Sequence, residues 1–79
     1  MSETKLSDLC ALPTYRQQRE NVFPSEGSLQ WFVRTHRDDL VRRGALLMLA
    51  GQWRIHVERF DAYVLEAGQA AALKRSGDA

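Results

Sequence analysis

Residues 25–34 read SEGSLQWFVR, and this stretch has the features of an amphipathic helix with a marked N-terminus. Ser25 is a favoured N-cap residue, and the acidic residue after it suits the positive end of the helix dipole. Leu29, Phe32 and Val33 recur at three- and four-residue steps, which places them on one face of a helix. The stretch therefore predicts a helix that begins after Ser25 and buries this apolar face.

A shorter helix is predicted just before this stretch, over residues 13–20. Pro13 suits the first helical position, and Leu12 would anchor the start of the helix to the core. Residues 21–24 separate the two helices, because Pro24 disfavours helical backbone in the residue before it. The N-terminal half of the chain thus predicts two helices joined by a sharp turn.

The residues that follow predict an interruption and then the end of the longer helix. Residues 35–38, THRD, have the form of a capping box with Asp in place of Glu, so we expect a break near Thr35. A further helical segment from Asp38 to Arg43 should end at Gly44, because glycine is the usual left-handed residue after a helix.

The C-terminal half predicts a β-hairpin followed by a helix. Residues 45–50 are apolar, residues 53–57 alternate, and Gly51-Gln52 lies between them, which is typical of two antiparallel strands. A helix from Glu58 to Leu73 is expected to bury one face. That face comprises Phe60, Val64, Ala67 and Ala71, with Tyr63 at its edge. The predicted core of the whole chain comprises Leu29, Phe32, Val33, Leu40, Leu46, Ile55, Phe60 and Val64.

Length and composition bound the kind of protein. With 79 residues, of which 44% are hydrophobic and 27% charged, the chain fits one small folded domain. We expect that domain over residues 12–73, with a flexible tail at 1–11 and a disordered tail at 74–79. No apolar run reaches the roughly 20 residues that cross a membrane, and residues 1–5 lack a signal sequence. We therefore expect a cytoplasmic protein.

The reactive side chains are too few and too scattered to predict a catalytic or metal site. Cys10 is the only cysteine, so an internal disulfide is excluded, and with only His36 and His56 beside it no four-ligand zinc site can form. The sequence contains no glycine-rich phosphate loop and no metal-ligand spacing. We therefore expect neither an enzyme nor a cofactor.

Positive charge gathers in the middle of the chain. The formal net charge is +1, but residues 14–60 contain eight Arg against five acidic residues. Arg presents a planar fork of donors that suits phosphate groups and guanine edges. An Arg-rich codon usage explains the same bias equally well, so the charge pattern permits nucleic-acid binding without requiring it.

Two segments resemble the winged helix-turn-helix domains of the excisionase and MerR-type group. Residues 25–34 are similar to the second helix of these domains, which begins with Ser and continues with a Ser/Thr–aliphatic pair, an aromatic and a basic residue. Residues 51–63, GQWRIHVERFDAY, are similar to the wing and the start of the following helix. The resemblance covers roughly residues 12–66. It implies a mainly α-helical (α+β) fold with a small β-hairpin, a winged helix-turn-helix.

This fold would bind double-stranded DNA with its longer helix in the major groove. In that arrangement Gln30 suits adenine, and Arg34 suits guanine or a phosphate. Arg16 and Arg19 would position the domain on the DNA backbone, and Arg54 would reach a flanking phosphate or the minor groove. The predicted DNA-binding residues are Arg16, Arg19, Ser25, Glu26, Ser28, Gln30, Trp31, Arg34, Arg37, Gln52 and Arg54.

Some of these residues, and others close to them in the sequence, also have a purely structural interpretation. Ser25 is as well explained by helix capping alone, and Trp31 and Trp53 by packing. Arg42 and Arg43 would extend the basic face, or would simply balance the two acidic residues that precede them in the helix.

The resemblance implies an excisionase-like recombination-directionality factor or a small transcriptional regulator of a mobile element. The partners would be double-stranded DNA, an integrase or recombinase, and a second copy of the chain docked on the Ala-rich C-terminal helix. The alternative is a protein-interaction module on a winged-helix scaffold without direct DNA binding. The low net charge and Gln52 at the wing tip favour this alternative.

Overall fold

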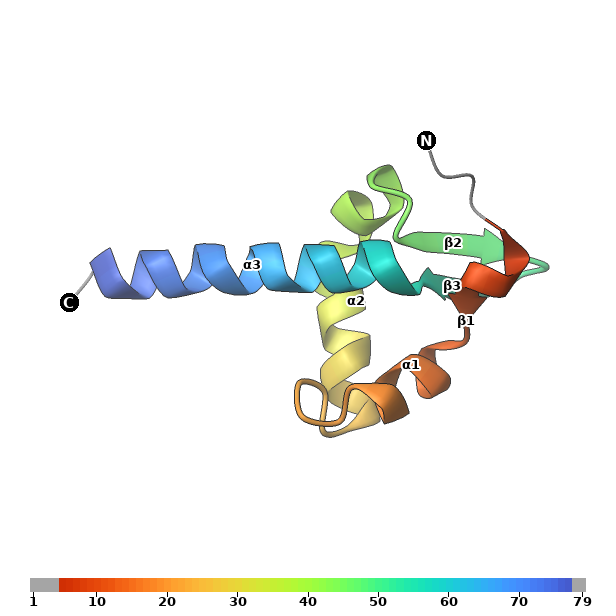
Figure 1. Ribbon diagram of the computed structural model, residues 1–79, viewed down its shortest axis with the longest axis horizontal. Helices are drawn as coiled ribbons and strands as arrows, with labels where there is room; N and C mark the ends of the chain where they lie inside the picture. Colours follow the sequence, from red (N-terminus) through yellow and green to blue (C-terminus); the bar gives the residue numbers. More distant parts are fainter. Residues whose placement is uncertain (1–4, 78–79) are drawn as a thin grey trace.

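The computed structural model describes residues 5–77, and the chain folds as a mainly helical α+β protein with a small antiparallel sheet (Figure 1). The sheet has three strands in the order β1-β3-β2. The elements in chain order are a 3-10 turn (Leu6–Asp8), β1 (Leu9–Cys10), α1 (Leu12–Gln18), α2 (Glu26–Arg42), β2 (Leu46–Leu49), β3 (Gln52–His56) and α3 (Val57–Gly77).

The two N-terminal helices and the turn between them confirm the sequence prediction. α1 carries Pro13 in its first turn and ends at Gln18, within two residues of the expected end. α2 begins directly after Ser25, whose hydroxyl accepts the amide hydrogen of Ser28 at 3.2 Å. The Ser28 hydroxyl in turn accepts the amide hydrogen of Ser25 at 3.3 Å, so the two serines cap the helix reciprocally.

The predicted interruption of α2 is confirmed, but the predicted capping box at residues 35–38 is wrong. His36 has the non-helical angles φ −112° and ψ 19°, which mark a kink. The Thr35 hydroxyl does not cap the following turn. It donates instead to the carbonyl oxygen of Trp31 at 2.8 Å, a bond back to the preceding turn that often bends helices. The Tyr63 hydroxyl of α3 lies 2.9 Å from Nδ1 of His36, so the kink is held from outside α2.

The β-hairpin is confirmed, with its turn one residue earlier than expected. Ala50 and Gly51 occupy the turn with φ of 52° and 76°, and Gln52 is already the first residue of β3. Two successive positive φ angles are typical of a type I′ turn, which matches the twist of antiparallel strands. β2 forms despite its helix-favouring Leu and Met residues because Gly44, at φ 72°, ends α2 as predicted and turns the chain toward β3.

The third strand lies in a segment that was expected to be tail. Leu9 pairs with His56 and Cys10 pairs with Ile55, so β1 extends the sheet on the free side of β3. A two-residue strand carries no periodicity of its own, and it forms here because β3 offers an unpaired edge. Cys10 is half-buried, and this burial raises the pKa of its thiol. The first four residues of the predicted tail lie outside the described residues.

The core lies between the sheet and the three helices. Six of the eight predicted core residues are buried, whereas Phe32 and Val64 are only half-buried against the core. Tyr15 of α1 and Phe23 of the α1–α2 turn were not among the predicted core residues, and their rings pack against Phe60 and Phe32. The buried core residues are Tyr15, Phe23, Leu29, Val33, Leu40, Ala45, Leu46, Ile55, Phe60 and Tyr63.

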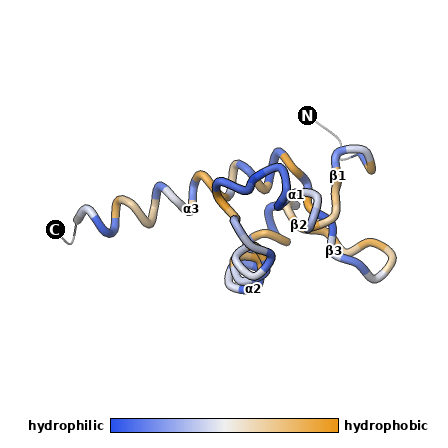
Figure 2. The backbone as a smooth tube through the Cα atoms, turned by 90° about the horizontal axis from the view of Figure 1, so that it is seen from below, coloured by the Kyte–Doolittle hydropathy of each residue, from blue (hydrophilic) through white to orange (hydrophobic). Residues whose placement is uncertain are grey.

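α3 is longer than predicted and leaves the body of the molecule. It passes the expected end at Leu73 and continues to Gly77, and its C-terminal half extends away from the other elements in both views (Figures 1 and 2). Ala71, expected on the buried face, is exposed because the helix has left the core by that point. The last two residues of the predicted C-terminal tail lie outside the described residues. Within residues 5–77, no helix combines the length and the apolar character needed to span a membrane.

Candidate nucleic-acid interface

α2 presents an exposed face that carries four of the eleven predicted DNA-binding residues. Its opposite face is fixed in the core by Leu29, Val33 and Leu40. Gln30, Arg34 and Arg37 follow at steps of four and three residues, and all three are exposed. Trp31 lies next to them and exposes 61% of its surface, so packing does not account for this tryptophan. The helix therefore offers an amide, an indole and two guanidinium groups on one accessible side.

A contact between α2 and the hairpin extends this face. The Arg37 guanidinium carbon lies 5.9 Å from the centre of the Trp53 ring in β3. A cation over an indole is attracted by the negative ring face, so the pair favours one position of the Arg37 side chain. Trp53 itself is half-buried against the core, as the packing interpretation predicted. The sequence predicted Arg37 as a DNA-binding residue and Trp53 as a packing residue, and it gave no sign that the two touch.

The predicted residues of the hairpin tip are folded back on the hairpin. Arg54 Nη2 donates to Oε1 of Gln52 at 2.6 Å, and Arg54 Nη1 donates to the carbonyl oxygen of Trp53 at 3.2 Å. Arg54 is half-buried in this position. Arg54 is thus the positive charge near the tip, and some of its N–H donors already form hydrogen bonds within the hairpin.

At the start of α2, the candidate site continues onto α1 through Arg16. Arg16 of α1 lines a hollow together with Glu26 and Gln30 of α2, and the apolar lining residues are Leu12, Pro13 and Leu29. Arg16 Nη1 donates to the carbonyl oxygen of Pro24 at 3.3 Å, which ties α1 to the turn before α2. The hydroxyls of Ser25 and Ser28 are both used in the helix cap described above. The structural interpretation of Ser25 as a cap is therefore confirmed.

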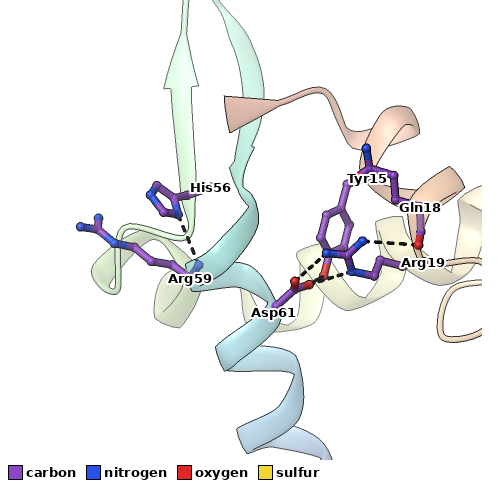
Figure 3. A network of polar contacts seen from close by, with 6 residues as sticks. All are labelled: Tyr15, Gln18, Arg19, His56, Arg59 and Asp61. Atoms are coloured by element: carbon purple, nitrogen blue, oxygen red, sulfur yellow. Dashed lines mark hydrogen bonds and ion pairs between the residues drawn. The ribbon is translucent and has the colours of Figure 1, made fainter. Parts of the chain in front are cut away.

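Arg19 has an intramolecular partner that the sequence did not reveal (Figure 3). Its Nε and Nη2 donate to the two carboxylate oxygens of Asp61 in α3, at 3.0 and 2.6 Å. The buried Tyr15 donates its hydroxyl hydrogen to the same carboxylate at 2.5 Å. The hydrogen bonds from Arg19 hold the pKa of Asp61 below its usual range, whereas burial raises the pKa of Tyr15. Arg19 thus joins α1 to α3, and its predicted phosphate contact stays a prediction.

The two cations at the end of α2, Arg42 and the following Arg43, also have acidic neighbours. Arg42 lies 3.8 Å from Asp39, which agrees with the charge-balancing interpretation. Arg43 pairs instead with Glu66 of α3 at 2.8 Å and stacks over the Tyr63 ring at 5.0 Å. The cations of α2 that carry no ion pair in the described structure are therefore Arg34 and Arg37.

The described residues show no cluster of three or more His, Cys, Asp or Glu side chains that could hold a metal ion. The buried His56 is satisfied locally, because its Nδ1 accepts the amide hydrogen of Arg59 at 3.3 Å (Figure 3). No family model, curated protein or solved structure matches the chain.

Proposed function

We propose that the protein binds double-stranded DNA as a winged helix-turn-helix, with α2 in the major groove and the β2–β3 hairpin as the wing. The observation that carries the proposal is the continuous exposed side formed by Gln30, Trp31, Arg34 and Arg37, which Trp53 joins to the hairpin. An α-helix fits the major groove of B-DNA, where amide and guanidinium groups distinguish adenine from guanine.

Each part of this side has a distinct task in the proposal. Gln30 and Arg34 face base edges, and the indole of Trp31 contacts the apolar methyl group of thymine or a deoxyribose. Arg37, held by Trp53, contacts a phosphate between the helix and the hairpin. Arg16 lies at the other end of α2, where it contacts the backbone on the far side of the groove.

The biological role that we propose is that of an excisionase-like recombination-directionality factor or a small transcriptional regulator of a mobile element. The resemblance of residues 25–34 and 51–63 supports this narrower proposal, and with it an integrase or recombinase as partner. A domain of this size contacts few base pairs, so useful specificity requires more than one copy on DNA.

Fluorescence anisotropy on two labelled duplexes tests the proposal. One duplex carries the DNA that flanks the protein's own gene, and the other is a scrambled sequence of equal length. A sequence-specific regulator binds the first duplex more tightly, and Arg34→Ala reduces that preference. Equal, salt-sensitive binding to both duplexes supports an architectural DNA-binding protein instead, and no binding at low salt contradicts the proposal.

We propose that the second copy docks on the free half of α3. Leu73 lies in this half and exposes 67% of its surface, and Leu65, just before it, exposes 74%. Three consecutive alanines at 70–72 give this half a small apolar surface as well. Sedimentation equilibrium should show a dimer that Leu73→Glu converts to a monomer, whereas a wild-type monomer at high concentration contradicts this contact.

A protein-interaction module without DNA binding is the second candidate. It is favoured by an apolar hollow between the end of α2 and the hairpin, lined by Val41, Leu46, Leu47, Met48, Leu49 and Trp53. Val41 and Met48 each expose about half of their surfaces there. Met48→Ser separates the two candidates without adding a charge, because it should weaken the binding of a protein partner far more than it weakens the affinity for DNA.

A further inference from the structure

Gly27, in the first turn of α2, is a glycine that the fold itself does not require. A Cβ built on this residue meets only the Ser25 hydroxyl oxygen, at 3.9 Å, which is an ordinary contact. The glycines that adopt positive φ in the described chain are Gly44 and Gly51, so Gly27 is not needed for its backbone conformation either. Glycine in a helix is less favourable than alanine, most strongly in the interior, so the fold gives no reason to prefer glycine at this first-turn position.

Gly27 lies on the side of α2 that carries two of the proposed DNA-binding residues. Gly27 lies four residues before Trp31 and seven before Arg34, so the three share one side of the helix. This side therefore begins with bare backbone and continues with a largely exposed indole and a guanidinium group. Gly68 of α3 has equally open surroundings but no such neighbours, so openness alone does not distinguish Gly27.

We propose that α2 makes its closest approach to DNA at Gly27, where the absent side chain lets the duplex surface contact the helix backbone. Glycine is the usual residue where a backbone closely approaches a ligand. Contact at this depth brings the Trp31 indole against the neighbouring sugar or thymine methyl, and it carries Arg34 to a base edge one turn deeper along the groove. Gly27 is thus a positioning residue of the proposed DNA interface, and this inference rests on the proposed function.

The substitution Gly27→Ala tests the inference because it adds one methyl group and removes nothing. In the free protein the methyl group fits and favours the helix, so Tm should rise by about 2–5 °C. In the complex the same methyl group occupies the space of the duplex, so the affinity for the flanking-DNA duplex should fall by about 5- to 100-fold. A larger side chain, as in Gly27→Leu, should weaken binding further.

Gly68→Ala is the matched control, since it also adds a methyl group to an exposed glycine of a helix. Gly68→Ala should raise Tm by a similar amount. It should not change the affinity for a short duplex that binds one copy of the protein. If Gly27→Ala binds the flanking-DNA duplex as tightly as the wild type does, the inference of a close approach at Gly27 is wrong, although the proposed function still stands. A fall in affinity together with a lower Tm also overturns it, because the methyl group then disturbs the helix. If the wild-type protein binds no duplex, the proposed function fails, and this inference fails with it.

Discussion

Replacing Asp61 by Asn should destabilise the fold measurably, because this carboxylate joins α1 to α3. It accepts hydrogen bonds from the Tyr15 hydroxyl at 2.5 Å and from Arg19 Nε and Nη2 at 3.0 and 2.6 Å. Asn keeps one carbonyl oxygen for Tyr15 and Nε, but it loses the charge and sets an NH₂ group against Arg19 Nη2. The substitution therefore removes one charge-assisted bond and introduces a donor–donor contact.

The exposure of the pair sets the size of the effect. The side chains of Arg19 and Asp61 are 29% and 34% exposed, so the pair is neither fully buried nor fully solvated. Exposed pairs contribute up to about 1 kcal/mol, whereas breaking a buried pair costs about 3–5 kcal/mol. We expect an intermediate loss of about 2 kcal/mol, which lowers Tm by about 8–16 °C in a domain of this size.

The effect should depend on pH in a defined direction. The pKa of Asp61 is lowered in the folded protein, chiefly by the hydrogen bonds from Arg19. The unfolded chain therefore binds more protons near pH 4, and the stabilisation is fully present above the unfolded pKa and lost as the pH falls through the folded value. The difference in Tm between wild type and Asp61→Asn should be constant from pH 6 to 8 and should shrink below about pH 4.

Thermal unfolding followed by circular dichroism measures this difference across pH. Arg42→Gln is the control, because it breaks the exposed pair of Arg42 and Asp39, which lie 3.8 Å apart, and should cost less than about 0.5 kcal/mol. If Asp61→Asn changes Tm no more than this control does, or if its effect persists unchanged to pH 2, the account of the Arg19–Asp61 contact is wrong.

Three further substitutions test other parts of the account. Ser25→Ala removes the acceptor for the Ser28 amide and should cost about 1 kcal/mol in thermal unfolding, with no loss meaning that the cap is unimportant. Gly44→Ala forces a Cβ into a backbone at φ 72° and within 2.5 Å of the Arg59 guanidinium, so it should lower Tm by about 5–15 °C; an unchanged Tm would show that the turn relaxes. Trp31→Ala should leave Tm within about 2 °C of wild type and weaken DNA binding at least tenfold, because the indole is largely exposed; a large fall in Tm would indicate a packing role instead.

The elements with local sequence signals were predictable. The cap at Ser25, the stop at Gly44 and the apolar periodicity of α2 act over a few residues, and the structure places α2 where they indicate. The kink at His36 was also expected, although its cause lies partly in Tyr63, 27 residues further along the chain. The local sequence therefore indicated where α2 is interrupted, but it did not reveal the contact from Tyr63 that holds the kink.

The contacts that connect distant segments were not predictable. The Arg19–Asp61 pair spans 42 residues, and no periodicity or spacing links its members. β1 exists only because β3 presents an edge, and Tyr15 is buried in a helix whose other residues are mostly polar. For the candidate site, the sequence identified the exposed α2 residues, but the stacking of Arg37 on Trp53 depends on how the hairpin packs against α2.

The salt dependence of DNA binding decides whether the exposed side of α2 recognises DNA. Each phosphate contact contributes a slope of about −0.9 to the logarithm of affinity against the logarithm of salt concentration. The double variant Arg34→Ala/Arg37→Ala should therefore flatten the slope by about one such step, because Arg37 contacts a phosphate in the proposed complex. The control Lys74→Ala/Arg75→Ala removes the same charge from the far end of α3 and should leave the slope unchanged. Equal slopes for the two double variants, or the absence of any salt-sensitive binding by the wild type, would contradict DNA recognition by α2.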